Sequence, residues 1–319
     1  MTRVPNADVF AALLRDAALS DAEVSSRVDR ACDADYWRSL TSDVSVLDSC
    51  AALDSQDSAE AAVQSAIASV RDDGVFQLPP VLADRSLRAL NAAVDAVVRA
   101  GWPAVFAFVY DQPWLCARLP SLARVVTGAL GVGYQQIPHV FTHVVQPRRG
   151  ASGWPPHVDG YSKGRLSVWV PLTAATLDNG CMYVVPSSAV ALEIAARPEW
   201  MCTLTGDEAL ALFHGSRAMP TPAGAPIGWR FDVVHWGGRV MTPGAERRAF
   251  SLEFIAAGQE PAGDEHPLVS PDGPLPSWPV RLRGVAAALD TYRKFDLPLL
   301  RFRRFATAVL DRVHPEDCQ

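Results

Sequence analysis

Two histidines and one aspartate have the types and the spacing of a non-haem iron site. His157 and Asp159 are two residues apart, and His235 follows much later in the chain. Two imidazoles and one carboxylate hold iron(II) on one face of an octahedron and leave three positions open, which suit a bidentate 2-oxo acid and O2. Side chains alternate along a strand, so the i, i+2 spacing places His157 and Asp159 on the same side. We therefore predict that these three residues are the metal ligands.

The distal histidine must come from another strand. His235 ends the β-rich run from Trp229 to Val234, and we expect this run to be one strand in which Phe231, Val233 and His235 share a face.

An isolated HxD or HxE is common by chance. His314-Pro315-Glu316 is such a case, and we discard it because no histidine follows it. The other histidines are interpreted as structural or solvent-exposed: His139, His143, His214 and His266.

A 2-oxo diacid needs an anchor for its distal carboxylate, and a guanidinium provides two parallel charge-assisted hydrogen bonds. Arg247 and Arg248 open the run after His235. Alternation places Arg247 with Ala249, Ser251 and Glu253, and Arg248 with the apolar side chains of the run. A pocket for a small anion is better lined by small and polar side chains, so Arg247 is the predicted anchor.

The elements that must position these residues are short and β-rich. Between about 134 and 256 the chain has short runs of β-branched and aromatic residues, separated by Pro, Gly, Asn and Asp. This pattern favours a β-sandwich or a jelly roll over a βαβ fold. The predicted fold class is mainly β with flanking helices, around a double-stranded β-helix (jelly roll, cupin-like) core. We expect three segments. Residues 1–70 form a helical N-terminal extension, with helical spacing at 9–19 and 59–70. Residues 71–258 form the oxygenase core with its leading helix, and residues 259–319 form a Pro-rich connector and a basic helical segment packed on the core.

The composition and net charge of the chain argue against several classes of function. The net charge of −6 argues against a nucleic-acid binder, because no excess of Lys and Arg exists to displace phosphate counterions. The N-terminal residues have no apolar signal region, and no apolar run is long enough to span a bilayer. The six scattered cysteines are typical of incidental thiols. We therefore expect a cytoplasmic enzyme with a small-molecule substrate, no nucleic-acid partner and no membrane partner. The oligomeric state stays open.

An ordered set of motifs resembles the phytanoyl-CoA dioxygenase (PhyH-like) family. The set comprises DDGVFQLPPVLADRSLRALNAAV from residue 72, HVDGY at 157–161, SVWVPLTAATLDNGCMYVVPSS at 167–188, VVHWGGR at 233–239 and RRAFSLEF at 247–254. The chain departs from the family pattern at Val158, at 186–189, at Gly228-Trp229 and at Gly237. The resemblance covers about residues 70–256.

The resemblance implies Fe(II) on His157, Asp159 and His235, with 2-oxoglutarate as co-substrate and O2 as oxidant. It places the distal carboxylate of 2-oxoglutarate on Arg247 and a pocket-lining tryptophan at Trp169, for which core packing is the equal alternative. The expected reaction is hydroxylation of an unactivated C–H in a metabolite, with decarboxylation of 2-oxoglutarate to succinate and CO2.

Other chemistries stay open. Desaturation, epoxidation and cyclisation use the same residues, whereas halogenation is disfavoured because Asp159 is present. A non-catalytic cupin-like binding protein is disfavoured because all three ligands are present, and a cupin that uses O2 without an oxo acid is a third alternative. Tyr161, His143 and Arg148 are the candidates for contact with the substrate, whose identity the sequence leaves open.

Overall fold

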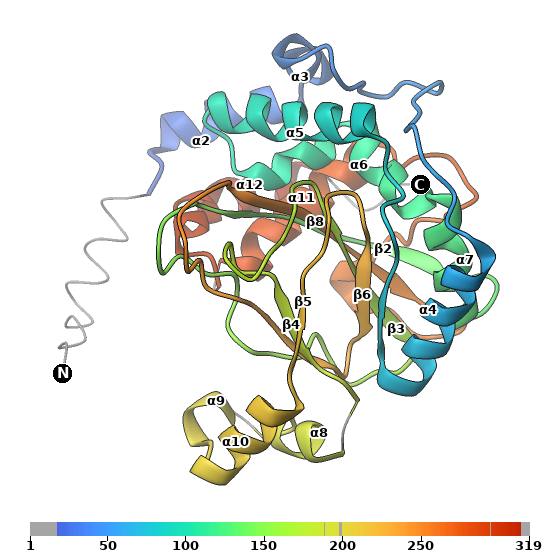
Figure 1. The fold of residues 1–319 in the computed structure, drawn as a ribbon. Coiled ribbons are helices and arrows are strands. Elements are labelled where there is room, and N and C mark those ends of the chain that lie inside the picture. The colour runs from blue at the N-terminus through green and yellow to red at the C-terminus, as the bar shows by residue number, and fades with distance from the viewer. Residues whose placement is uncertain (1–17, 188, 198–199, 294, 314–319) are drawn as a thin grey trace, which may run out of the picture.

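Two antiparallel sheets form the centre of the molecule (Figure 1). The computed structural model describes residues 18–187, 189–197, 200–293 and 295–313. The larger sheet has five strands, in the order β1 (Val75–Gln77), β6 (Ile227–Arg230), β3 (Arg165–Pro171), β8 (Arg247–Ile255) and β2 (Gln135–Val145). The smaller sheet has three, in the order β5 (Arg217–Met219), β4 (Met182–Val185) and β7 (Val234–Gly237).

Alternation along β3 and β8 gives the larger sheet two different faces. Leu166 and Val168 on β3 join the main hydrophobic cluster with the helices. Trp169 points the other way and packs in a second cluster with Ala249 of β8 and Met182 of the smaller sheet. The polar and small side chains of β3 and β8 therefore lie between the two sheets.

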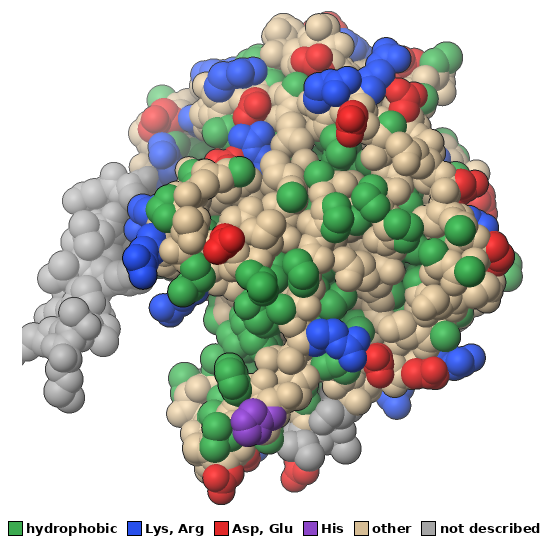
Figure 2. All heavy atoms as spheres, in the orientation of Figure 1, with side chains coloured by type: hydrophobic (Ala, Val, Ile, Leu, Met, Phe, Trp, Pro, Cys, Tyr) green, Lys and Arg blue, Asp and Glu red, His purple; other side chains and the backbone are tan. Residues whose placement is uncertain are grey.

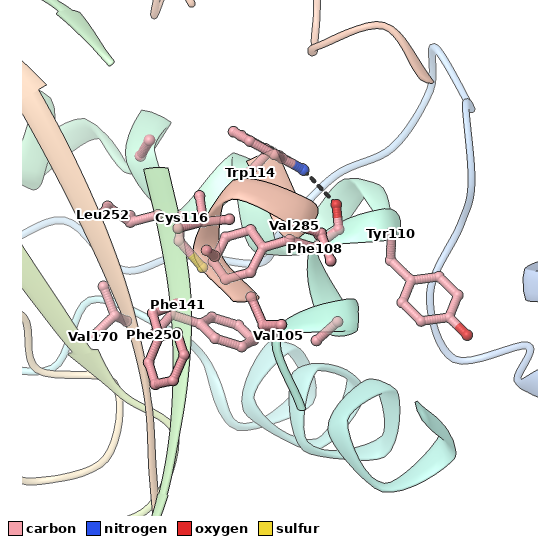
Figure 3. Packing of buried hydrophobic residues seen from close by; sticks show 14 of the residues in the cluster. Val105, Phe108, Tyr110, Trp114, Cys116, Phe141, Val170, Phe250, Leu252 and Val285 are labelled. Atoms are coloured by element: carbon pink, nitrogen blue, oxygen red, sulfur yellow. Dashed lines mark hydrogen bonds between the residues drawn. The ribbon is translucent and has the colours of Figure 1, made fainter. Parts of the chain in front are cut away.

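Helices pack on the outer face of the larger sheet. Phe250 of β8 meets Phe108 with 5.0 Å between ring centroids, and the indole nitrogen of Trp114 donates to the Phe108 carbonyl (2.7 Å; Figure 3). The packing elements before β2 are α2 (Asp21–Cys32), α3 (Ala34–Leu40), α4 (Glu60–Asp73), α5 (Asp84–Arg99), η1 (Ala104–Val109), α6 (Asp111–Leu115), η2 (Cys116–Arg118) and α7 (Pro120–Leu130). Those after β8 are η3 (Gly263–Glu265), α11 (Trp278–Tyr292), η4 (Leu297–Phe302) and α12 (Arg303–Arg312).

The local sequence explains where α2 begins, where α4 ends and which face of α5 is buried. Ser20 caps α2 in a capping box with Glu23. Gly74 ends α4 with a φ of 77°, a left-handed conformation that favours glycine, and β1 starts at the next residue. Leu90, Val94 and Val97 of α5 recur at helical spacing and are fully buried.

A small helical lobe lies between β4 and β5 and extends away from the sheets (Figure 1). It contains α8 (Ala189–Ala195), α9 (Trp200–Thr203) and α10 (Gly206–Gly215). Trp200, Ile194 and Val234 of β7 form a cluster at its base. Leu210 and Phe213 are exposed on it. On the face drawn in Figure 2, Lys and Arg side chains are interspersed with Asp and Glu.

The structure confirms antiparallel sheets with flanking helices, and it corrects three expectations. Helices contribute more of the described residues than strands do, so the fold is not mainly β. The run 229–236 is not one strand, because a turn at 231–233 separates β6 in the larger sheet from β7 in the smaller one. His157 and Asp159 lie in a loop that touches β7 through a single bridge, rather than on a regular strand.

The basic C-terminal segment includes one arginine that is buried rather than exposed to solvent. Arg281 is buried at 1% exposure and pairs with the fully buried Asp111 at 2.7 Å. The five cysteines in the described part of the chain are free, as expected. The predicted helix at 9–19 falls mostly outside the described residues, as does His314-Pro315-Glu316. No helix among the described residues is long and apolar enough to cross a membrane.

Candidate metal centre

The side chains of His157, Asp159 and His235 converge on one point between the sheets. The Nε2 atoms of both histidines lie 3.6 Å from Oδ1 of Asp159. The three potential ligand atoms lie within 4.8 Å of one another. The backbones of His157 and His235 exchange hydrogen bonds of 3.0 and 2.9 Å, and the Asp159 N–H donates to the Phe231 carbonyl. The loop and β7 are therefore joined directly at the cluster.

Backbone carbonyls orient both imidazole rings. Nδ1 of His157 lies 2.8 Å from the Pro155 carbonyl oxygen, and Nδ1 of His235 lies 3.0 Å from that of Val233. A carbonyl can only accept, so each Nδ1 carries the proton and each Nε2 presents a lone pair to the cluster. Burial lowers the pKa of His235 to about 4, so this imidazole is neutral at pH 7. Neutral imidazole is the form that binds metals.

Two donors on the larger sheet fix the Asp159 carboxylate. Its Oδ2 accepts hydrogen bonds from Ser167 Oγ at 2.6 Å and from Trp229 Nε1 at 3.0 Å, while Oδ1 faces the histidines. Burial opposes ionisation, but His235, His157 and the two donors outweigh it and hold the pKa of this carboxyl below its usual value. The carboxylate is thus held ionised with one oxygen free for a cation.

Arg247 lies deep in the space between the sheets, as its face of β8 predicts. It is 2% exposed, and its guanidinium lies 5.6 Å from the Trp169 ring and 3.7 Å from the Met182 sulfur. Among the described residues it makes no ion pair. Burial lowers its pKa to about 10. We call this space the inner cavity; it is lined by Arg247, Trp169, Met182, His143, Ser251 and the histidine–aspartate cluster.

Two glycines make room beside the guanidinium. A Cβ on Gly237 would lie 2.7 Å from the Gly153 Cα and 3.0 Å from Nη2 of Arg247. A Cβ on Gly153 would lie 2.8 Å from the same nitrogen. Such distances are shorter than real Cβ contacts allow, so only glycine fits at either position with the present arrangement.

Arg248 points to the helical side of the sheet instead. It pairs with Asp95 of α5 at 2.7 Å and with Glu246. The side chains that share its face, Phe250 and Leu252, belong to the main hydrophobic cluster. The structure therefore separates the two arginines as alternation predicts.

The three residues expected to contact the substrate are not together. His143 lines the inner cavity, where its Nε2 lies 2.8 Å from Ser251 Oγ, and burial lowers its pKa to about 3. Tyr161 is 61% exposed, donates to the Ala195 carbonyl and lines a second cavity. Arg148 is exposed in the turn after β2 and lines neither cavity.

The second cavity, here called the outer cavity, has a volume of about 450 Å³. It shares His157, Asp159, Trp154, Glu253 and Tyr292 with the inner cavity, so the two meet at the cluster. Sequence reasoning missed Trp229, Ser167 and Tyr292. Ser167 could have been found, because it shares the inward face of β3 with Trp169. Nothing local marks Tyr292, which reaches the cavity from the C-terminal segment.

Comparison with known proteins agrees with this geometry. Residues 104–249 match the family model "Phytanoyl-CoA dioxygenase (PhyH)". The fold is similar to that of the epimerase SnoN from nogalamycin biosynthesis (TM-score 0.51, 20% identity, 68% of this chain and 95% of that chain). It is also similar to the carbocyclase SnoK from the same biosynthesis (0.50, 19%, 69% and 94%) and to the non-heme monooxygenase ThoJ (0.53, 17%, 77% and 99%). No curated protein gives a significant sequence match.

The class follows from the family match together with the His-Asp-His cluster. The protein is an oxidoreductase of the type that uses Fe(II), 2-oxoglutarate and O2, as the sequence predicts. Within that class, the match of residues 104–249 to the PhyH family model confirms the resemblance seen in the sequence.

Proposed function

We propose that the protein hydroxylates an unactivated C–H of a small-molecule metabolite, with conversion of 2-oxoglutarate to succinate and CO2. In this proposal His157, Asp159 and His235 hold Fe(II), and Arg247 and Trp169 hold 2-oxoglutarate. One oxygen atom of O2 enters the substrate as hydroxyl and the other enters succinate. When bound, iron with 2-oxoglutarate supplies the oxidising power that takes a hydrogen from carbon.

One observation carries the proposal: three buried nitrogen atoms that face the inner cavity have no hydrogen-bond partner in the described part of the chain. They are Nε2 of His157, Nε1 of Trp169 and Nε of Arg247. Buried polar atoms are rarely left unsatisfied, and each such atom costs about 1–3 kcal/mol. A metal on His157 and a diacid beside Arg247 would satisfy at least two of these atoms at once.

The charges fit the same pair of groups. Arg247 is buried and has no anionic partner among the described residues, and the Asp159 carboxylate is held ionised with one oxygen toward the two imidazoles. A dianion with one carboxylate on the guanidinium and the other on the cation would neutralise both ends. Gly153 and Gly237 leave the approach to the guanidinium open. SnoN, whose fold is similar, was crystallised with iron, as Fe3+, and with alpha ketoglutarate, the oxo acid proposed here.

The chain's own part is positioning and exclusion of water. The two backbone carbonyls and the Ser167 and Trp229 donors fix the ligand side chains before the cation arrives. The substrate would enter through the outer cavity and present its C–H at the cluster, where the two cavities meet. We also propose that the two antiparallel sheets form the double-stranded β-helix core of such oxygenases.

The test is a product balance. Protein loaded anaerobically with Fe(II) and 2-oxoglutarate should release succinate when O2 is admitted, and a substrate in the assay should gain one oxygen atom per succinate. A product that has lost two hydrogens, or formed a ring, would replace hydroxylation by desaturation or cyclisation. O2 uptake without succinate would overturn the proposal in favour of a cupin oxygenase that needs no oxo acid.

A further inference from the structure

Three aromatic rings form one wall of the outer cavity. Trp154 stacks on both Tyr292 and Phe295, with centroid distances of 4.7 and 5.1 Å and interplanar angles of 29° in both pairs. Phe295 also lies 5.5 Å from the ring of His157. These rings pack on one another and on His157, so they form one aromatic cluster beside the metal centre.

Glu253 faces the same cavity from β8. It is the cross-strand partner of Ser167, the residue that donates to Asp159. Directly opposite side chains in an antiparallel pair have Cβ atoms about 5 Å apart. Glu253 lines both cavities, as His157 and Asp159 do, so it lies near the point where the two cavities meet.

The Glu253 carboxyl has no cationic partner in the described part of the chain. It accepts a hydrogen bond from the Tyr292 hydroxyl at 3.2 Å, which is a neutral donor. The nearby Arg165 is held by Glu265 in a bidentate pair. Burial, and then the charge of Asp159, raise the pKa of Glu253 to about 8. Glu253 is thus a half-buried carboxyl that faces the cavity without a cation among the described residues.

At a pH where Glu253 is ionised, such as pH 8.5, its charge would be the one left over among the described residues once iron and 2-oxoglutarate are bound. The two positive charges of Fe(II) and that of Arg247 would balance the Asp159 carboxylate and the two carboxylates of 2-oxoglutarate. Arg165 and Glu265 balance each other. No further cation among the described residues pairs with Glu253, so a positive charge on the substrate would suit this position.

We propose that the outer cavity takes a substrate bearing a positively charged amine, with the ammonium held by Glu253 and by the aromatic wall of Trp154, Tyr292 and Phe295. This inference rests on the proposed function for treating the cavity as the substrate site. A carboxylate with aromatic faces is the combination that recognises substituted ammonium groups. Because Glu253 lines both cavities, the ammonium would lie in the same space as the carbon that is oxidised.

The test uses two probes of the same shape. Choline and its uncharged isostere 3,3-dimethylbutan-1-ol differ in the charge of the quaternary centre, and neither is offered as the natural substrate. Their binding is measured by calorimetry at pH 8.5, in metal-free protein and in the anaerobic Fe(II)/2-oxoglutarate form. Choline should bind at least about tenfold more tightly, since a desolvated charge pair is worth more than the 1.4 kcal/mol that this ratio represents.

Single-residue variants test which side chains cause the preference for choline over the alcohol. Glu253→Gln should abolish the preference for choline, whereas Glu260→Gln, the same change at an exposed carboxyl near the cavity, should keep it. Phe295→Leu should weaken choline more than the alcohol. Equal binding of both probes by the wild-type protein, or a preference that survives in Glu253→Gln, would overturn the inference. The metal-free arm makes this result independent of turnover, so failure of the proposed function would be seen separately, as absence of succinate.

Discussion

Replacement of Arg247 by methionine should have two opposite effects, one on stability and one on affinity. Burial lowers the pKa of this guanidinium from 12.5 to about 10. One pKa unit corresponds to about 1.4 kcal/mol, so burial disfavours the charged form by about 3 kcal/mol. Methionine removes this cost but loses the contact with Trp169, worth about 0.5–1 kcal/mol. The free energy of unfolding of metal-free Arg247→Met should therefore rise by about 1–3 kcal/mol, which raises the Tm by a few degrees.

The affinity for 2-oxoglutarate should fall in the same variant. A desolvated charge-assisted pair is worth about 2–5 kcal/mol when one partner is removed, so the Kd should rise by at least about 30-fold. Thermal shift measures both effects in one titration. The wild-type Tm should climb with 2-oxoglutarate in the presence of Zn(II) or anaerobic Fe(II), whereas the variant should start higher and stay nearly flat.

Arg248→Met is the matched control for this prediction. It removes ion pairs with Asp95 and Glu246 on the helical side, so its Tm should stay the same or fall slightly. Its response to 2-oxoglutarate should be that of the wild type. The reasoning is refuted if Arg248→Met loses the response, or if Arg247→Met keeps it.

Three further predictions follow from the site. Gly237→Ala should weaken 2-oxoglutarate binding at least about tenfold, because its Cβ would meet Gly153 and Arg247. An unchanged Kd by calorimetry would show that the space beside Arg247 is not needed for 2-oxoglutarate. Trp229→Phe should weaken Fe(II) binding by about 10–100-fold by removing a donor to Asp159, which a competition titration with a chelating dye measures. In metal-free protein, Glu253 keeps its proton to a pH of about 8 when folded but ionises near 4.5 when unfolded, so stability should fall as pH rises through this window. Glu253→Gln should remove that loss and have the higher Tm at pH 9 but not at pH 4; parallel Tm curves would show that Glu253 is not buried at this cost.

Much of the site could be predicted because its signals are local. The His-x-Asp pair, the later histidine and the alternation along 247–254 depend on residue type and spacing alone, and the structure brings these side chains to one cavity. Alternation assigned Arg247 and Arg248 to opposite faces because β8 is a regular nine-residue strand paired on both sides. The ligand roles and the division into three segments stay predictions.

The failures share a physical cause, which is that the deciding contacts are long-range. The run 229–236 alternates like one strand, but the chain turns at 231–233 because its two halves pair with different sheets. In the sequence, Arg281 looks like a solvent-exposed helix residue. In the structure it is buried in an ion pair with Asp111, which lies 170 positions earlier in the chain. The aromatic wall joins Trp154 to Tyr292 and Phe295, and no spacing in the sequence relates those positions.

The central claim is that His157, Asp159 and His235 bind iron in a form that accepts 2-oxoglutarate. Anaerobic absorption spectroscopy tests it most directly, because the complex of Fe(II) with a 2-oxo acid has a weak charge-transfer band in the visible. The wild-type protein should show the band only when Fe(II) and 2-oxoglutarate are both present, and His235→Ala should lose it. His143→Gln should keep it, since His143 bonds to Ser251 and lies outside the cluster. A band that survives in His235→Ala, or disappears in His143→Gln alone, would contradict the assignment.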